Sequence, residues 1–369
     1  MKRALAMTAL VTSAACTNFA DPTTVVDLRV LAVKAEPSEI ILDVDLSNPA
    51  MPVVDPANNP AITITPLIAD PAGNMRSVKY TISACPNDPF APAPPGGGQG
   101  GGAFPSGGAR TTVGSALCDE NSPTTWILWD QPADAGTSVT VQPTADQLKQ
   151  AFMQDVFPDQ YGNLHGGFDL GMPFTFDIKV DAGTADTGIE EIRAIKRVLY
   201  WAQRIDPAQT PNQTPQMAML DAFLQRDEAT FTPIDEPKTV EDMVPFDVPA
   251  GTKEIWIRPA PATAEPFWTT VIDPDTHQAV PFHVDRETLR YRFFATAGTF
   301  SPAVTSSEPM PGFVPTGPIP LESKLALPTD TGGLPIDMPT GRPVITIWVV
   351  VRDDRGGESW LQRQLLITP

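Results

Sequence analysis

Histidine and cysteine are scarce in this chain, with three of each among 369 residues. No G-x-S-x-G, H-E-x-x-H, C-x-x-C or Cys–His arrangement occurs, and these patterns identify many nucleophilic, zinc and thiol-redox enzymes. His277 and His283 lie near Asp273, Asp275 and Asp285 in the sequence, which fits either a metal site or exposed histidines on an acidic surface. We therefore predict a protein that is not an enzyme and has no catalytic residue, metal site or cofactor.

Basic residues and long apolar runs are also scarce. The chain has 25 Lys and Arg against 44 Asp and Glu, a formal net charge of −19 at pH 7. A surface this acidic repels nucleic acid and anionic lipid headgroups, so neither is expected as a direct partner. No segment offers the ~20 consecutive apolar residues that a membrane-spanning helix needs. The 42 prolines argue against long helices and favour short strands between ordered loops.

The first residues have the order of a bacterial secretory signal. Lys2 and Arg3 precede an apolar run, and small residues then lead to Cys16. This order predicts a signal peptide at residues 1–15, a lipid on Cys16 and a tether at residues 16–26. Ser13 stands where a lipobox usually has Leu, and an ordinary signal peptidase site would leave Cys16 as a free thiol. Thr17, in place of an aspartate, favours the outer membrane, with the protein on its periplasmic or surface face.

The remaining cysteines form an even pair. If Cys16 carries lipid, Cys85 and Cys118 are left in an oxidising compartment, where a disulfide is expected. Two unpaired thiols are the alternative. Residues 86–117 between them are rich in proline and glycine, so we expect a flexible insertion closed at its base by the disulfide.

Period-two alternation of apolar and polar residues dominates the rest of the chain. It predicts strands at 26–30, 42–46, 62–64, 78–84, 124–129, 138–141, 174–180, 192–201, 253–258, 289–295, 344–352 and 360–367. Thr144 and Gln147 form a capping box for a short helix, and residues 217–227 look helical by composition. Prolines around 206–215 divide the chain into 27–205 and 206–369. The sequence therefore predicts an all-β protein of tandem Ig-like β-sandwich domains with a short helical insertion.

A hairpin turn is expected between the last two strands. Asp353 and Asp354 precede Gly356 and Gly357 there. These aspartates fit either the capping of the turn or a calcium site in an inter-strand loop. The seven tryptophans fit either sandwich cores, where strand aromatics usually pack, or sugar-stacking surfaces: Trp126, Trp129, Trp201, Trp256, Trp268, Trp348 and Trp360.

Three segments carry a family resemblance. Residues 27–37 read DLRVLAVKAEP, residues 290–300 read RYRFFATAGTF and residues 349–357 read VVVRDDRGG. The first resembles the start of uncharacterised envelope lipoproteins of myxobacteria and related bacteria. The others are similar to strands of their second Ig-like module and to the ends of PKD-like domains. The resemblance implies architecture and location, and it brings no known activity.

Together these features lead to one functional expectation. We expect a bacterial cell-envelope lipoprotein with a non-enzymatic binding or scaffolding role, held at the membrane by its N-terminal lipid. Its partner is expected to be an envelope protein or a glycan. An adhesion or carbohydrate-binding module is the alternative, and an accessory protein of an envelope enzyme is the third.

Overall fold

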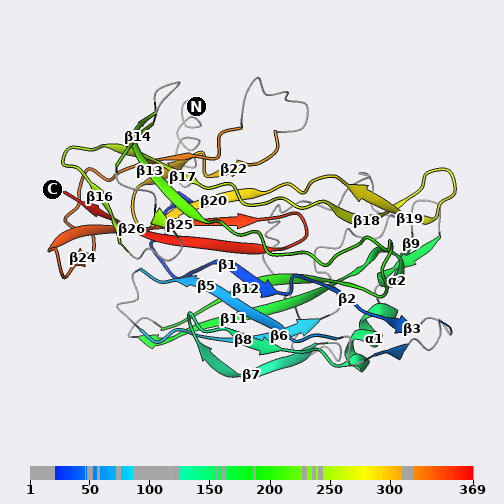
Figure 1. Cartoon of the computed structure of the whole chain (residues 1–369). Coiled ribbons are helices and arrows are strands. Elements are labelled where there is room, and N and C mark those ends of the chain that lie inside the picture. The colour runs from blue at the N-terminus through cyan, green and yellow to red at the C-terminus, as the bar shows by residue number, and fades with distance from the viewer. Residues whose placement is uncertain are drawn as a thin grey trace, which may run out of the picture.

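The described part of the chain folds into two β-sandwiches, with two short helices in the first (Figure 1). The computed structural model describes residues 21–45, 47, 53–55, 59–71, 76–85, 118, 125–154, 156–158, 163–185, 188–226, 231–234, 238–239, 244–309 and 319–368. The expected signal peptide, Cys16 and insertion 86–117 lie outside these residues. Neither described helix is long and apolar enough to cross a bilayer. The expected all-β fold of tandem Ig-like sandwiches is confirmed.

The first sandwich has a three-stranded and a five-stranded sheet. The smaller sheet has the order β1 (Arg29–Glu36), β5 (Ile62–Ala69), β8 (Val139–Val141). The larger has the order β2 (Glu39–Ile41), β12 (Gly188–Trp201), β11 (Met172–Ala185), β6 (Lys79–Cys85), β7 (Trp126–Asp134). Short elements complete this half: β3 (Val44–Asp45), β4 (Val53–Val54), α1 (Ala145–Gln154), β9 (Val156–Pro158), β10 (Leu164–Gly166) and α2 (Gly167–Leu170).

The second sandwich has two larger sheets and a separate hairpin. One sheet has the order β14 (Phe231–Pro233), β13 (Met219–Arg226), β17 (Glu254–Pro259), β23 (Ser323–Ala326), β21 (Thr299–Ser301), with β15 (Lys238–Thr239) beside β13. The other has the order β16 (Phe246–Val248), β26 (Glu358–Ile367), β25 (Arg342–Arg352), β20 (Arg290–Ala295), β22 (Val304–Ser306), with β24 (Ile336–Asp337) beside β25. Strands β18 (Phe267–Ile272) and β19 (Ala279–Val284) form the hairpin.

One topological feature repeats in both halves. A short strand pairs in parallel with the last strand of its sandwich, β2 with β12 and β16 with β26. The neighbouring strands in the same sheets pair antiparallel. Both halves therefore have the same arrangement of closing strands, as expected of tandem Ig-like modules.

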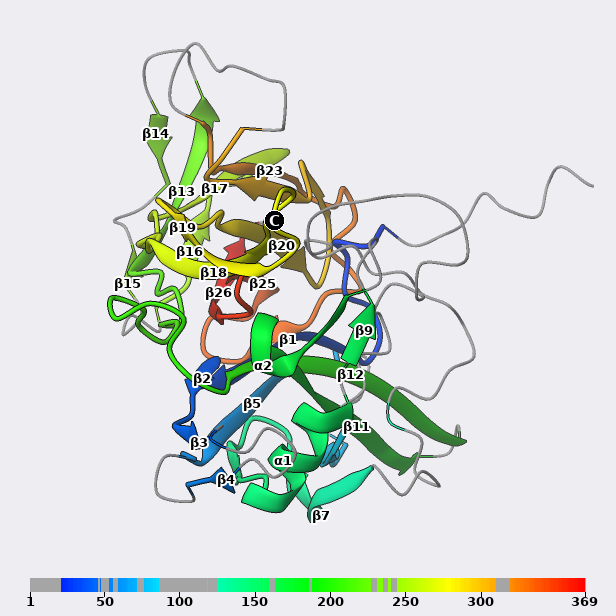
Figure 2. The same cartoon turned by 90° about the vertical axis from the view of Figure 1, so that its right-hand side faces the viewer.

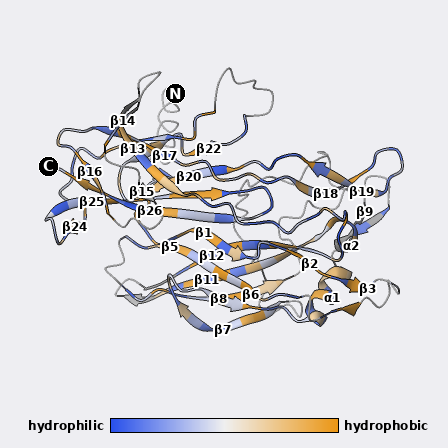
Figure 3. Ribbon diagram, in the orientation of Figure 1, coloured by the Kyte–Doolittle hydropathy of each residue, from blue (hydrophilic) through white to orange (hydrophobic). Residues whose placement is uncertain are grey.

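Each sandwich has its own hydrophobic core. Apolar and polar residues alternate along the strands (Figure 3), and the apolar positions point between the two sheets. Phe174, Phe176 and Ile178 on β11 fill the first core, as their alternation predicts. Tyr291 and Phe293 on β20 fill the second.

A third hydrophobic cluster joins the two sandwiches. Strands β1 and β5 of the first half pack against β20, β25 and β26 of the second (Figure 1), and Figure 2 shows β1 and β12 between the two halves. Its buried members are Val25, Leu31, Ala32, Leu67, Ala69, Trp348 and Val350. Strand β25 is thus covered on both faces, so the two sandwiches form one stack of sheets.

Part of the expected tether is built into this stack. Thr24 forms a parallel bridge with Ala295 at the end of β20, and Val25 N donates to Ala295 O at 2.8 Å. The side chains of Thr23 and Val25 are buried. Residues 21–25 therefore pack on the second sandwich, because a buried valine and backbone hydrogen bonds hold them there.

Two local predictions have different outcomes. Residues 217–227, expected to be helical, instead contain strand β13, because pairing with β17 and β14 outweighs the weak helical composition. The capping box of α1 is confirmed, since Gln147 N donates to Thr144 Oγ1 at 3.2 Å and Thr144 N donates to Gln147 Oε1 at 2.8 Å.

Candidate functional site: a charge cluster between the sandwiches

The structure joins the two cysteines that the sequence pairs. Cys85 at the end of β6 forms a disulfide with Cys118, with their Cα atoms 5.6 Å apart. Cys118 N also faces Asp177 Oδ2 at 3.4 Å, and Asp177 on β11 is buried and lies 3.1 Å from Arg193 Nη1. The base of the insertion is therefore fixed against the five-stranded sheet.

The three histidines lie in separate places. His165 is buried on β10, whereas His277 lies in the β18–β19 turn and donates its backbone N–H to Asp273 O at 2.9 Å. His283 is exposed on β19, where its ring packs on Trp268 with centroids 4.9 Å apart and its Nδ1 lies 3.3 Å from Asp285 Oδ1. Among the described residues, no group of three or more His, Cys, Asp or Glu is placed to hold a metal ion.

The turn between β25 and β26 is capped by the aspartate that the sequence singles out. Asp353 Oδ1 accepts hydrogen bonds from the backbone N–H groups of Arg355 at 2.9 Å and Gly357 at 2.7 Å. Asp354 Oδ2 accepts from Thr288 N at 2.8 Å. Gly356 has a φ of 94°, a conformation that favours glycine. The carboxylates thus cap the turn and connect it to the chain before β20.

This turn directs Arg355 into the boundary between the sandwiches. Its guanidinium contacts three carboxylates, at 2.9 Å to Glu39 Oε2, 3.2 Å to Glu265 Oε2 and 3.5 Å to Glu287 Oε2. Glu39 is on β2 of the first sandwich, and the other two belong to the second. The guanidinium also lies 5.0 Å from the ring centroid of Phe267 on β18. One arginine therefore connects the two halves through buried ion pairs.

The chain between the two sandwiches takes part in the same cluster. Asn212 N donates to Glu39 Oε2 at 2.7 Å, and Asn212 Nδ2 donates to Asp353 Oδ2 at 2.9 Å. Trp201 Nε1 donates to Glu39 Oε1 at 2.5 Å. The region that separates the two sequence blocks is thus fixed to both of them.

A second buried ion pair crosses the boundary nearby. Lys196 on β12 lies 3.4 Å from Glu358 Oε2 on β26 and also donates to the carbonyl of Gly356. Val33 N on β1 donates to the same Glu358 oxygen at 3.3 Å. Below, the interdomain charge cluster means Glu39, Lys196, Asn212, Glu265, Glu287, Asp353, Arg355 and Glu358.

Burial shifts the ionisation of this cluster. Desolvation, followed by the charge of Asp353, raises the pKa of Glu287 to about 7. Burial also raises the pKa of Glu39 and of Asp353, although Arg355 acts in the opposite direction on both. Burial lowers the pKa of Lys196 against the opposing charge of Glu358. Glu39, Glu287 and Asp353 therefore take up protons at a higher pH than exposed carboxylates do.

One strand position in the sequence indicates this cluster, although the overall composition and the motifs do not. In strand 192–201, Lys196 shares its face with Ala194, Val198 and Tyr200, so a charge occupies an apolar register. A buried lysine needs a carboxylate or carbonyl partner, which here comes from the other sandwich. The sequence singles out Asp353 for its role in the turn, but it does not indicate that Glu39, Glu287 and the remaining members meet there.

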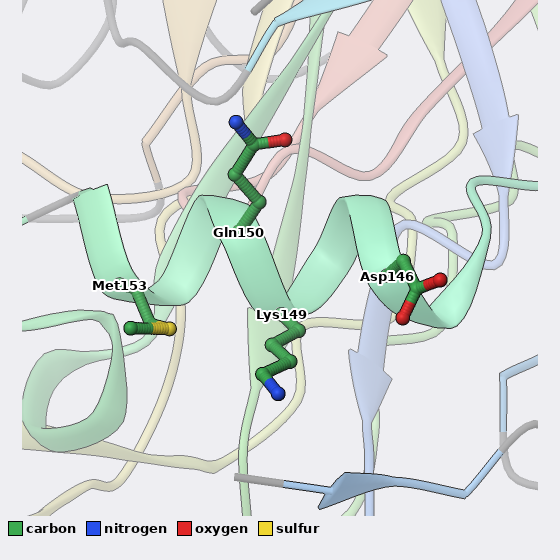
Figure 4. A pocket seen from close by; sticks show the side chains of 4 residues that line it. All are labelled: Asp146, Lys149, Gln150 and Met153. Atoms are coloured by element: carbon green, nitrogen blue, oxygen red, sulfur yellow. The ribbon is translucent and has the colours of Figure 1, made fainter. Parts of the chain in front are cut away.

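Among the described residues, neither the tryptophans nor a depression on the surface of α1 forms a second cluster of functional side chains. Trp201 and Trp348 are buried, and the other five tryptophans are partly exposed. A shallow depression on α1 is lined by four side chains of that helix, which point in different directions (Figure 4): Asp146, Lys149, Gln150 and Met153. The cluster around Arg355 is therefore the strongest candidate site, and its geometry serves to join domains. No protein-family model, curated protein or solved structure matches this chain.

Proposed function

We propose that this protein is a bacterial cell-envelope lipoprotein, anchored in the outer membrane through a lipid on Cys16, with a non-enzymatic binding or scaffolding role. The strongest support is the interface between the sandwiches. A hydrophobic cluster and two sets of buried ion pairs join them, and residues 21–25 pack on the same block. A rigid stack holds its surface loops in fixed relative positions. This suits a scaffold better than two sandwiches joined by a flexible linker would.

The anchor is tested by metabolic labelling with an alkyne analogue of palmitate. Wild-type protein should carry the label and sediment with membranes, whereas Cys16→Ala should do neither. Trypsin resistance of the soluble variant provides the control that the sandwiches still fold. Unlabelled wild-type protein released into the medium would contradict the proposed anchor.

The scaffolding role is tested by photo-crosslinking in the native cell, with the crosslinker on the exposed side chains of Phe282 and Met153. An envelope protein crosslinked at one position and not at the other supports a directed scaffold. The absence of any envelope product at both positions would argue against it.

One observation favours the carbohydrate-binding alternative. Trp268 is partly exposed on the β18–β19 hairpin and its ring packs on His283, whereas exposed Phe282 lies on the other face of the hairpin. Exposed aromatic rings stack on sugar faces, so this hairpin is where a glycan would bind. Binding of purified cell-wall glycan fragments that is lost in Trp268→Ala and retained in Trp256→Ala would establish this alternative.

A further inference from the structure

The N-terminal segment meets the second sandwich before it enters the first. Thr23 O accepts from Ala295 N at 2.9 Å, and Thr23 Oγ1 accepts from Phe300 N at 3.0 Å. Thr24 Oγ1 donates to Gly298 O at 2.6 Å. These contacts fix residues 21–25 at the turn between β20 and β21.

This turn lies at one defined end of the stack. Ala295 at the end of β20 pairs with Ile347 in the middle of β25. Thr296 N then donates to Thr346 O at 2.9 Å, so the turn continues toward the start of β25, where Val344 pairs with Leu366 near the end of β26. Strand β1 then leads away to the opposite end, where Glu39 meets Arg355 and the β18–β19 hairpin begins. The chain therefore enters at the end of the stack opposite to the hairpin.

Covalent geometry limits how far a lipid on Cys16 can lie from this end. Cys16 is five residues before Asp21 in the sequence. An extended chain spans at most about 3.6 Å per residue, so the two residues lie within about 18 Å of each other. A lipid at Cys16 thus holds the β20–β21 end of the second sandwich close to the bilayer.

The same end of the stack carries two exposed apolar side chains, Ile336 on β24 and Met338 in the turn that follows, here called the apolar tip. Strand β24 pairs with the start of β25, Ile336 with Pro343 and Asp337 with Arg342. Asp337 Oδ2 accepts from Thr340 N at 3.0 Å, and Gly341 N donates to Asp337 O at 2.7 Å, which orders the turn. The side chains at its tip face solvent, with Ile336 51% and Met338 89% exposed.

We infer that the second sandwich faces the bilayer and that Ile336 and Met338 contact the lipid headgroup region, while the β18–β19 hairpin points away from the membrane. This orientation rests on the proposed lipid anchor. The acidic surface disfavours adsorption to anionic lipid, so the contact is confined to the apolar tip and is held there by the anchor.

Fluorescence quenching tests the orientation in the full lipidated chain. Met338→Cys and Phe282→Cys each provide one labelling site, because Cys16 is acylated and the other cysteines form a disulfide. Both replaced side chains are exposed, so folding is retained. In phosphatidylcholine vesicles with a headgroup quencher, the label at 338 should be quenched several-fold more strongly than the label at 282.

Mass spectrometry of the N-terminus on the same samples separates the two proposals. Three outcomes with lipidated protein would overturn the orientation and leave the anchor intact. These are equal quenching at both sites, stronger quenching at 282, and no quenching at either site. Protein without lipid on Cys16 would overturn both.

Discussion

Replacement of Arg355 by methionine is the sharpest perturbation of the interdomain charge cluster. Methionine retains an unbranched side chain in place of the aliphatic stem of Arg355 and removes the cation that contacts Glu39, Glu265 and Glu287. Glu39 and Glu287 are buried, so the variant leaves carboxylates in a poorly solvated boundary. Breaking one partner of a buried ion pair costs about 3–5 kcal/mol, and we expect a loss of this size in the free energy of unfolding above neutral pH.

The pH dependence follows from the shifted carboxylates. The pKa of Glu287 rises from 4.5 to about 7 on folding, so its contribution to stability is complete below about 4.5 and is lost as pH rises through about 7. Each pKa unit corresponds to about 1.4 kcal/mol, so this group alone makes the wild type less stable at about pH 8 than at about pH 5.5 by about 2 kcal/mol. Arg355 holds these pKa values down, so its removal steepens this dependence.

Urea unfolding followed by tryptophan fluorescence measures both effects, because buried Trp201 donates to Glu39 in the cluster. Lys324→Met is the matched control, since Lys324 pairs with Glu254 on the surface and should cost less than about 1 kcal/mol. The interpretation fails if Arg355→Met loses less than about 1 kcal/mol at about pH 8, or if its loss is the same at about pH 5.5.

Three further predictions follow from other parts of the structure. Cys85→Ser should lose about 3–4 kcal/mol under oxidising conditions and nothing relative to the reduced wild type, as urea unfolding would show; equal stability under oxidising conditions would contradict it. Gly357→Ala should lose at least about 1–3 kcal/mol in the same assay, because the added Cβ would lie 2.1 Å from Asp353 Oδ2. Gly333→Ala is the control, since a Cβ at Gly333 meets open space, and similar losses in both variants would refute the steric argument. Residues 27–205 and 206–369, expressed separately, should each be soluble and give a β-type circular dichroism spectrum, because each half has its own core. The 206–369 half should also bind a hydrophobic dye, because removal of the first sandwich exposes Trp348. Failure of either half to fold would show that the hydrophobic cluster shared by the two sandwiches is indispensable.

Local patterns were enough to predict most strands of both sandwiches. Alternation at residues 174–180 predicts β11, and alternation at 289–295 predicts β20, because side chains on a strand point to opposite faces in turn. The capping box at Thr144 and the turn before Gly356 could also be predicted from the sequence, because each depends on hydrogen bonds within a few residues. Counting cysteines was sufficient to pair Cys85 with Cys118.

Only the tertiary structure decided how the two halves meet. Strand β13 forms because neighbouring strands pair with it, and residues 21–25 are ordered by contacts with a sandwich that begins about two hundred residues later in the sequence. The apolar run Trp348–Val351 shows that β25 is buried on both faces, yet the covering strands β1 and β5 come from the other half. Arg355 and Glu39 lie 316 positions apart. Their pairing is non-local, and no periodicity along the chain encodes it.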